Sequence, residues 1–291
     1  MRLGLVLPVF TADIERPRAV AAQAAGFEGV FAADHVFPPG APDSLAVEAF
    51  SLLAAVAAAN PGLGVGVLVT RASMRPVGIL AKLAAGLDHV SGGRAVLGLG
   101  LGDASGRLEH EALRIAYPPI QERAVVLEET CLALRSLFAG RAWEGGSLVP
   151  PVAGPILPLA SPPVWIGGAS DRVLGIAARA ADGWNGWGLP AEGFAARVAA
   201  LRHLSVEAGR DPAVVEPTWG GIMLVGEDAT DLEALEAERA GNGLPMDVWR
   251  GTVTDLSRFA TRLADAGATW LIARAAGPAD RPSLIAETLR R

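Results

Sequence analysis

A turn of small residues between an expected strand and an expected helix is the first feature of this sequence that could bind a ligand. The apolar segment 163–166 precedes it and a helical segment, 173–180, follows it; the turn itself is Gly167, Gly168, Ala169 and Ser170. Small residues let consecutive backbone N–H groups approach an anion, and the helix N-terminus adds a favourable partial charge. We therefore predict a phosphate site, although a tight turn with Ser170 as N-cap would have the same sequence.

A histidine follows the second apolar segment, 29–33, almost directly. His35 and its neighbour Asp34 stand at the end of an expected strand, where an imidazole can donate or accept a proton near neutral pH. Two other histidines, His89 and His203, lie within expected helices. We predict His35 as the proton donor or acceptor of a reaction, and a capping or packing role is its alternative.

Polar side chains also stand at the ends of the third and fourth apolar segments. Thr70 and Arg71 offer a hydroxyl and a guanidinium, which suit the polar edge of a ring or an anionic tail. Asp103 follows Gly102 and adds a carboxylate, which is the second candidate for proton transfer. For Arg71 the alternative is a side chain that only solvates its loop.

Glycines recur in the fourth apolar segment, at positions 98, 100 and 102. The dinucleotide-binding fingerprint needs another glycine at a set spacing and a helix directly afterwards, so a doubly wound nucleotide-binding sheet is the weaker alternative. Glycine inside a strand lets a flat group approach the backbone closely. We expect a ring system near Gly100 and Gly102, with Trp184 of the sixth segment as an apolar wall.

Apolar segments of strand length alternate along the chain with longer segments of helical period. The strand segments are 3–7, 29–33, 63–69, 95–101, 163–166, 183–187, 217–225 and 269–273. The helical segments are 16–25, 47–58, 74–90, 120–138, 173–180, 191–208, further helices between 228 and 266, and 282–289. Continuous apolar strands that alternate with helices indicate parallel pairing with both faces buried. Eight such units predict an α/β protein, a (β/α)8 TIM barrel with its site at the C-terminal strand ends.

Two long stretches fall outside this alternation, one after strand 4 at residues 103–119 and one before strand 5 at residues 141–162. The second is rich in proline and predicts an extended surface crossing. The first would lie on the face of the site and close over a substrate, unless it is a solvated loop; its polar residues are Glu109, His110, Glu111 and Tyr117. Nothing resembles a linker, so we expect a single domain over residues 1–291.

Composition excludes several classes of protein. The 25 basic and 31 acidic residues give a net charge of −6 without a run of like charge, which argues against nucleic acid as a partner. Cys131 is the single cysteine and lies on an apolar helical face, so we expect a buried and inert thiol. The N-terminal apolar segment stops at Pro8, too early for a signal peptide, which predicts a cytoplasmic chain without membrane contact. No metal site is expected.

Three segments of the sequence together indicate a known family. Residues 26–35 read Gly-Phe-Glu-Gly-Val-Phe-Ala-Ala-Asp-His, and residues 87–94 read Leu-Asp-His-Val-Ser-Gly-Gly-Arg before a glycine-rich strand. Residues 166–170 form the turn described above, and 180–184 read Ala-Ala-Asp-Gly-Trp. Over nearly the whole chain these motifs resemble the bacterial luciferase-like superfamily of flavin and deazaflavin oxidoreductases.

The resemblance implies a barrel that holds an isoalloxazine or deazaflavin ring over its strand ends, with a backbone bulge near Val69 and Thr70. It implies that the cofactor's phosphate lies on the 167–170 turn, and that His35 and Thr70 face the ring and the substrate. Flavin-dependent monooxygenases of the family carry a second histidine beside the first, which this chain lacks. The segment 181–185 is similar to the subgroup that uses coenzyme F420.

These observations and the resemblance together lead us to expect an oxidoreductase that uses coenzyme F420 for hydride transfer to or from a small organic substrate. An FMN-dependent monooxygenase that consumes reduced flavin and O2 is the first alternative, and a non-catalytic flavin-binding barrel is the second. We expect a small-molecule substrate as the partner, and a homodimer is left open. The expected catalytic residues are His35 and Asp103, and the expected cofactor-binding residues are Asp34, Val69, Thr70, Arg71, Gly100, Gly102, Gly167, Gly168, Ala169, Ser170 and Trp184.

Overall fold

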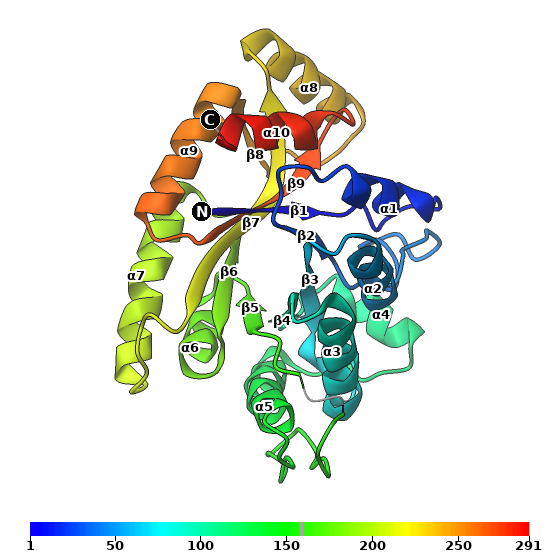
Figure 1. Ribbon diagram of the computed structural model, residues 1–291, viewed down its shortest axis with the longest axis vertical. Coiled ribbons are helices and arrows are strands. Elements are labelled where there is room, and N and C mark those ends of the chain that lie inside the picture. Colours follow the sequence, from blue (N-terminus) through cyan, green and yellow to red (C-terminus); the bar gives the residue numbers. More distant parts are fainter. Residues whose placement is uncertain (158–159, 291) are drawn as a thin grey trace.

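A closed ring of parallel strands forms the centre of the computed structural model, which describes residues 1–157 and 160–290 (Figure 1). In the ring, β1 to β7 lie side by side in the order of the sequence. Strand β9 closes the ring by pairing with both β7 and β1. The eight strands of the ring are β1 (Arg2–Val6), β2 (Gly29–Ala32), β3 (Gly64–Arg71), β4 (Ala95–Gly100), β5 (Val164–Gly167), β6 (Gly183–Trp187), β7 (Glu216–Gly226) and β9 (Trp270–Ala276). The predicted (β/α)8 barrel is confirmed.

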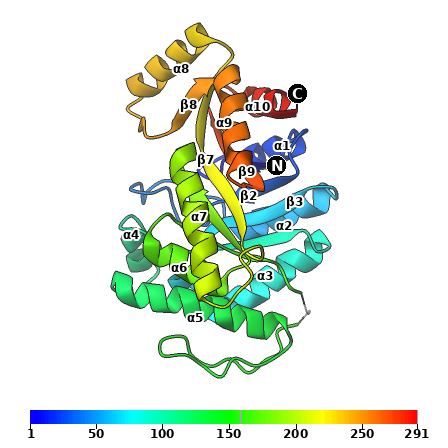
Figure 2. The same ribbon diagram turned by 90° about the vertical axis from the view of Figure 1, so that its left-hand side faces the viewer.

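Helices surround the ring and bury its outer face (Figure 2). They are α1 (Glu15–Ala22), α2 (Ala49–Ala59), α3 (Val77–Ser91), α5 (Ile120–Phe138), α6 (Asp171–Ala180), α7 (Ala191–Glu207), α8 (Ala229–Gly241), α9 (Val253–Asp265) and α10 (Arg281–Arg290), with a short 3-10 helix, η1 (Ala72–Met74), after β3. Cys131 of α5 is fully buried, and burial raises the pKa of its thiol to about 12, so the thiol stays protonated and unreactive. Within the described residues, every helix is too short or too polar to span a bilayer.

A ninth strand, β8 (Trp249–Thr252), was not expected from the sequence. It pairs in parallel with the last residues of β7, Met223 to Gly226, outside the closed ring. Figure 1 shows β8 and α8 together at one end of the molecule, beyond the ring. The prediction of helices alone between 228 and 266 was therefore wrong. The four residues of β8 have little apolar character and show no periodic pattern in the sequence. The strand forms because β7 extends far enough to pair with it.

The stretch after β4 also differs from its prediction as a non-periodic loop, because it contains the helix α4 (Gly106–Ala112). This helix is only seven residues long, which is too short for a clear helical period. It is held by tertiary contacts, since Glu109 and His110 are both fully buried. The two residues therefore belong neither to a solvated loop nor to a mobile lid.

Aromatic side chains fill part of the interior of the ring. Phe31, Trp165 and Trp270 form a mutual cluster with ring centroids 5.6 to 6.1 Å apart. Glycines on the neighbouring strands make room for them, because a Cβ at Gly66 would lie 2.6 Å from Phe31 and one at Gly183 would lie 2.4 Å from Trp165. The interior is therefore packed at this level, and in this fold ligands bind at the C-terminal ends of the strands.

The insertion before β5 is anchored to α5 by one carboxylate. Glu129 accepts hydrogen bonds from the backbone N–H groups of Ser147, Leu148 and Val149 and from the Ser147 hydroxyl. An antiparallel bridge between Trp143 and Val152 closes this part of the predicted crossing. Residues 158–159 of that crossing lie outside the described residues.

The carboxylate of Glu129 makes this anchor sensitive to acid. Burial alone would raise the pKa of Glu129, but the hydrogen bonds from Ser147, Leu148 and Val149 lower it from 4.5 to about 2. Because the folded pKa lies below the unfolded one, the stabilisation is complete above pH 4.5 and is lost as the pH falls towards about 2.

We predict that Glu129→Gln lowers the melting temperature by about 2–4 °C at pH 7 and that this difference narrows in acid. Calorimetry of both proteins from pH 7 downward tests it, with Glu144→Gln in the same insertion as the control. A constant difference at all pH values would contradict the assignment.

Candidate functional site

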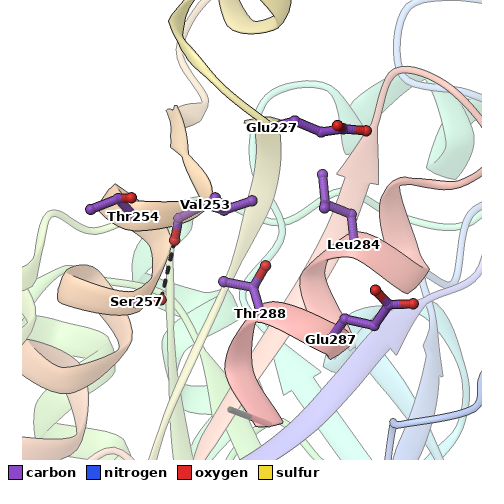
Figure 3. A pocket seen from close by; sticks show the side chains of 7 residues that line it. All are labelled: Glu227, Val253, Thr254, Ser257, Leu284, Glu287 and Thr288. Atoms are coloured by element: carbon purple, nitrogen blue, oxygen red, sulfur yellow. Dashed lines mark hydrogen bonds between the residues drawn. The ribbon is translucent and has the colours of Figure 1, made fainter.

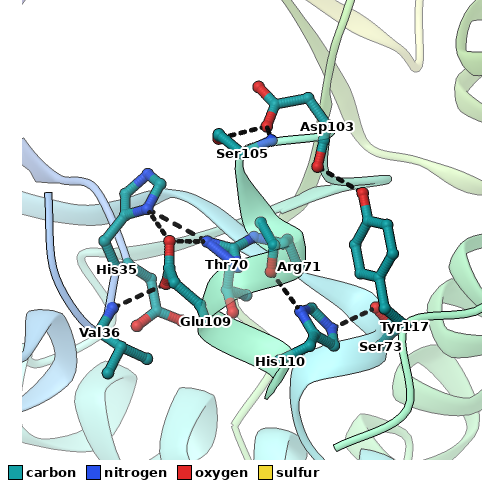
Figure 4. A network of polar contacts seen from close by, with 12 residues as sticks. His35, Val36, Thr70, Arg71, Ser73, Asp103, Ser105, Glu109, His110 and Tyr117 are labelled. Carbon is teal, nitrogen blue, oxygen red and sulfur yellow. Dashed lines mark hydrogen bonds and ion pairs between the residues drawn. The ribbon is translucent and has the colours of Figure 1, made fainter. Parts of the chain in front are cut away.

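Polar residues from the C-terminal ends of β2, β3 and β4 meet at one side of the barrel mouth (Figure 4). His35 follows β2, Arg71 ends β3, and Glu109 comes from α4 in the connection after β4. Arg71 Nη2 lies 3.1 Å from His35 Nδ1, and both nitrogens approach the same carboxylate oxygen of Glu109. The strand ends therefore bring together residues far apart in the sequence, as parallel pairing requires.

Glu109 is the centre of this cluster. Its Oε1 lies 2.7 Å from His35 Nδ1 and accepts a hydrogen bond from Arg71 Nη2 at 2.7 Å, while Oε2 accepts from the backbone N–H of Val36 at 2.8 Å. An ionised carboxylate only accepts hydrogen bonds, so His35 Nδ1 carries a proton and donates it. In the neutral form of the ring, Nε2 is then the basic nitrogen, and it makes no hydrogen bond with the described residues.

The charges of this cluster are balanced although it is buried. Burial by itself would raise the pKa of Glu109, but the hydrogen bonds from His35 and Val36 and the charge of Arg71 hold that pKa below its ordinary value. The Glu109 side chain is fully buried and that of Arg71 is 6% exposed, whereas the His35 side chain is 21% exposed. The imidazole is thus the member of the cluster that a ligand can reach.

Asp34 and Thr70 lie beside this cluster but serve a different partner. Arg75, which follows η1, donates from Nη2 to Asp34 Oδ1 at 3.0 Å and from Nη1 to Thr70 Oγ1 at 3.0 Å. Asp34 and Thr70 are both buried. The expectation that Thr70 faces a ring is therefore corrected, because its hydroxyl is fully enclosed and hydrogen-bonded to Arg75.

Arg71 was expected at a ring edge or an anionic tail, and it too has another role. Its charge is taken up by Glu109, and its side chain packs so closely on the next connection that a Cβ at Gly102 would lie 2.7 Å from Arg71 Cδ. Gly102 has a φ of +73°, which also favours glycine. Gly102 therefore makes room for Arg71.

The bulge expected near the end of β3 is present between Val67 and Thr70, where the register with β4 shifts and the Leu68–Val69 peptide is cis. It turns the Val69 side chain into the barrel mouth. A Cβ at Gly100 would lie 2.8 Å from Val69, and one at Gly167 would lie 2.9 Å from it. These glycines thus accommodate Val69, which is half-buried and forms part of the surface at the mouth.

The turn after β5 offers backbone donors to a ligand. Gly168 adopts a φ of +135°, and its N–H donates to the carbonyl of Asn185. The N–H groups of Ala169 and Ser170 have no acceptor among the described residues, and the Ser170 hydroxyl caps α6 by accepting from Val173. Two free donors at the N-terminus of a ten-residue helix suit an anion.

Trp184 supports this turn from behind. Its ring is fully buried and stacks on Phe194 of α7, and its Nε1–H donates to the carbonyl of Gly168 at 2.7 Å. Successive residues of a strand point to opposite faces, and Trp184 points outward to the helices. The expectation that Trp184 forms an apolar wall of the site is therefore corrected.

Asp103 lies apart from His35, in a second cluster that follows β4. Hydrogen bonds from Ser105, first from its hydroxyl, lower the pKa of Asp103, so the carboxylate is ionised at neutral pH. Tyr117 donates to the Asp103 carbonyl and accepts from Arg123, and its ring lies edge-on to His110. Burial lowers the pKa of His110, which stays neutral and structural.

Of two hollows on the surface of the described residues, one adjoins the strand-end cluster. The larger, of about 370 Å³, lies between α9 and α10 and contains no predicted site residue (Figure 3). The smaller, of about 270 Å³, is lined by Asp34, His35, Val36, Ala46, Glu48, Met74, Arg75 and Leu113. We take the smaller one as the candidate site, because a ligand there reaches His35.

Sequence reasoning missed Arg75 and did not place Glu109. A signal for Arg75 was present, since a carboxylate at a buried strand end such as Asp34 requires a cationic partner. The partnership of Glu109 with His35 and Arg71 had no such signal, because it depends on how α4 folds back. Among residues 1–157 and 160–290, no group of three or more His, Cys, Asp or Glu side chains could hold a metal ion.

Removal of Glu109 should be costly because two donors and a buried guanidinium depend on it. We predict that Glu109→Ala lowers the free energy of unfolding by about 3–5 kcal/mol, and that Glu111→Ala on the exposed side of α4 changes it by less than about 0.5 kcal/mol.

Urea denaturation measures both variants, together with Arg71→Ala and the double variant. The double variant should lose less stability than the two single losses combined, because no uncompensated charge remains. Additive losses would show that Glu109 and Arg71 do not interact.

Comparison with known proteins identifies the family of this chain. The family model described as luciferase-like monooxygenase matches residues 6–288. A phthiodiolone/phenolphthiodiolone dimycocerosates ketoreductase from Mycobacterium sp. (strain JLS) is 29% identical over 209 residues, 66% of this chain and 52% of the relative. An F420-dependent glucose-6-phosphate dehydrogenase from Nakamurella multipartita is 32% identical over 177 residues, 57% of this chain and 49% of that protein. The chain thus spans about half the length of these relatives.

Solved structures share the fold over the full chain. An F420-dependent secondary alcohol dehydrogenase in complex with an F420-acetone adduct aligns with a TM-score of 0.83 at 16% identity, covering 100% of this chain and 99% of the other. An EDTA monooxygenase from Chelativorans sp. BNC1 aligns with a TM-score of 0.80 at 17% identity, covering 99% and 92%. With the family model matched from residue 6 to residue 288, this chain belongs to the luciferase-like monooxygenase family.

Proposed function

We propose that this chain is an oxidoreductase that uses coenzyme F420 for hydride transfer to or from a small organic substrate. The observation that carries the proposal is His35, a reachable imidazole whose Nδ1–H is held by the buried Glu109, while Nε2 has no hydrogen-bond partner among the described residues. The relative from Nakamurella multipartita, named as F420-dependent, supports the choice of cofactor. When bound, the deazaflavin supplies the hydride chemistry, and the protein supplies position, a dry surface and a proton.

Residues of the barrel mouth fit such a cofactor. Its phosphate would be held by the free N–H groups of Ala169 and Ser170, with Gly167 and Gly168 allowing close approach. Its ring would lie on the surface formed by Val69 at the β3 bulge. The other expected cofactor-binding residues would act through the shape of that surface. Three of them are buried and paired with other side chains: Asp34, Thr70 and Arg71. Gly100 and Gly102 make room for their neighbours, and Trp184 holds the turn after β5.

His35 is proposed as the residue that gives or takes the substrate proton, at Nε2. Glu109 is a positioning residue, because it fixes the imidazole tautomer and orientation through Nδ1. Asp103 is the second candidate, in the role of a base, because its lowered pKa leaves it without a proton to donate at neutral pH. The hollow beside His35 offers space for the substrate.

An FMN-dependent monooxygenase that consumes reduced flavin and O2 is the second candidate function. The description of the family model, luciferase-like monooxygenase, favours it. A non-catalytic flavin-binding barrel is disfavoured because a buried carboxylate, Glu109, orients the His35 imidazole, and binding alone does not need an oriented imidazole. A homodimer, the absence of a nucleic-acid partner and a cytoplasmic location stay predictions from the sequence.

The choice of cofactor can be tested by titration. We predict that F420 binds at least about tenfold more tightly than FMN, a difference of about 1.4 kcal/mol, in fluorescence titrations of the purified protein. Gly168→Glu should abolish binding of the preferred cofactor, because a carboxylate at the turn repels the phosphate.

Gly168→Ala is the matched control, since it imposes the same backbone strain without the charge. Unchanged affinity in Gly168→Glu would remove the phosphate assignment. Tight FMN binding with O2-dependent turnover and no F420 binding would establish the monooxygenase instead.

The role of His35 can be separated from cofactor binding. We predict that His35→Ala lowers kcat by about 100-fold or more, the usual contribution of general acid–base catalysis, with the cofactor Kd changed by less than about threefold. Steady-state kinetics and cofactor titration measure the two effects.

The exposed helical His203→Ala serves as the control and should leave both values unchanged. Wild-type turnover in His35→Ala would reduce His35 to a packing role and make Asp103 the first candidate.

A further inference from the structure

Arg274 of β9 stands at the mouth of the barrel on its inner face. Trp270 and Ile272 of the same strand belong to the apolar cluster inside the ring. Side chains alternate along a strand, so Arg274 shares their inward face, one step nearer the C-terminal end. Its register partner on β7 is Ile222, which is likewise only half-buried. The guanidinium therefore lies above the packed interior, at the level where a ligand would enter.

Phe10 connects Arg274 to the proposed proton-transfer residue. The Arg274 Cζ lies 5.5 Å from the centroid of the Phe10 ring, and the His35 ring lies edge-on to Phe10 with centroids 5.5 Å apart. Phe10 follows β1 and His35 follows β2, and the strands β9, β1 and β2 are consecutive in the ring. Arg274 and His35 thus contact one aromatic ring, in the same third of the barrel mouth.

The charge of Arg274 is not compensated by the described residues. Arg71, Arg75 and Arg281 each form an ion pair, with Glu109, Asp34 and Asp231, whereas no carboxylate pairs with Arg274. Burial lowers the pKa of Arg274, and the charge of Arg239 lowers it further. A cation that is partly removed from water without a partner is unfavourable, and an oxyanion bound to it would remove that cost.

We infer that Arg274 is an anion-binding residue that receives a carboxylate or phosphate group of the substrate while another part of the substrate reaches His35. The assignment to the substrate rests on the proposed function; the anion site itself does not. The cofactor's phosphate has its own place on the turn after β5, three strands away from β9 in the ring. The substrate class is therefore a small organic anion, and Arg274 contributes to its selection.

Inorganic phosphate tests the anion site without any cofactor. Every protein in the comparison carries Gly168→Glu, which removes the turn after β5 as a second phosphate site, and calorimetric titrations run at constant ionic strength. In that background Arg274→Met should weaken phosphate binding by about tenfold or more, and Arg274→Lys should retain most of it because the charge remains. Arg258→Met, an exposed arginine of α9, is the matched control and should leave it unchanged.

Equal phosphate affinity in Arg274→Met and Arg258→Met would overturn the inference. Circular dichroism checks the fold of each variant, and Arg274→Gln replaces Arg274→Met, with the same expectation, if the latter does not fold. F420 titration without the Gly168 change then separates the two sources of the anion. If Arg274→Met and wild type bind F420 with an equal Kd, the anion at Arg274 belongs to the substrate. If Arg274→Met binds F420 tenfold more weakly, the anion belongs to the acidic tail of the cofactor, and the substrate assignment is overturned. Failure of F420 to bind wild type would end the proposed function and leave the phosphate result standing.

Discussion

The buried carboxylate of Glu109 is the interaction on which the candidate site depends. An ionised carboxylate is tolerated without exposure only when donors satisfy both oxygens, and here His35, Arg71 and the Val36 N–H do so. The same three bonds tie α4 to the ends of β2 and β3. The orientation of the His35 imidazole and the position of the connection after β4 therefore depend on the same hydrogen bonds. A neutral or exposed residue at 109 would leave Arg71 as an uncompensated buried charge.

Large side chains placed opposite glycines shape the rest of the barrel. Inside the ring, Phe31 and Trp165 find space because their register partners on the next strands are Gly66 and Gly183. Near the C-terminal ends, the bulge in β3 turns Val69 into the space left by Gly100 and Gly167. Because the interior is packed, the C-terminal end of the barrel is the place proposed for a planar cofactor ring. In the proposed function the barrel supports the cofactor ring at this end.

Charge around the mouth is distributed unevenly, and this distribution carries functional information. On the side of β2 and β3, Arg71 pairs with Glu109 and Arg75 pairs with Asp34, so the charges of these side chains compensate each other. Among the described residues, the backbone N–H groups of Ala169 and Ser170 on the side of β5 have no acceptor, and the guanidinium of Arg274 on the side of β9 has no counterion. In the proposed function the balanced part positions His35, and a charged ligand would compensate the unbalanced parts.

The amino-acid sequence alone determined the architecture and the strand ends that carry His35, Arg71 and Asp103. Those conclusions depend on periodicity and on turn residues, which are local properties of the chain. It did not reveal β8, α4 or the outward direction of Trp184, and it overlooked Arg274 one residue beyond an expected strand. Which donor meets which carboxylate depends on segments far apart in the chain: Glu109 is 74 residues from His35, and Arg75 is 41 from Asp34. Only the closed barrel brings such segments within hydrogen-bond distance, so the partners of every buried charge were decided by the tertiary structure.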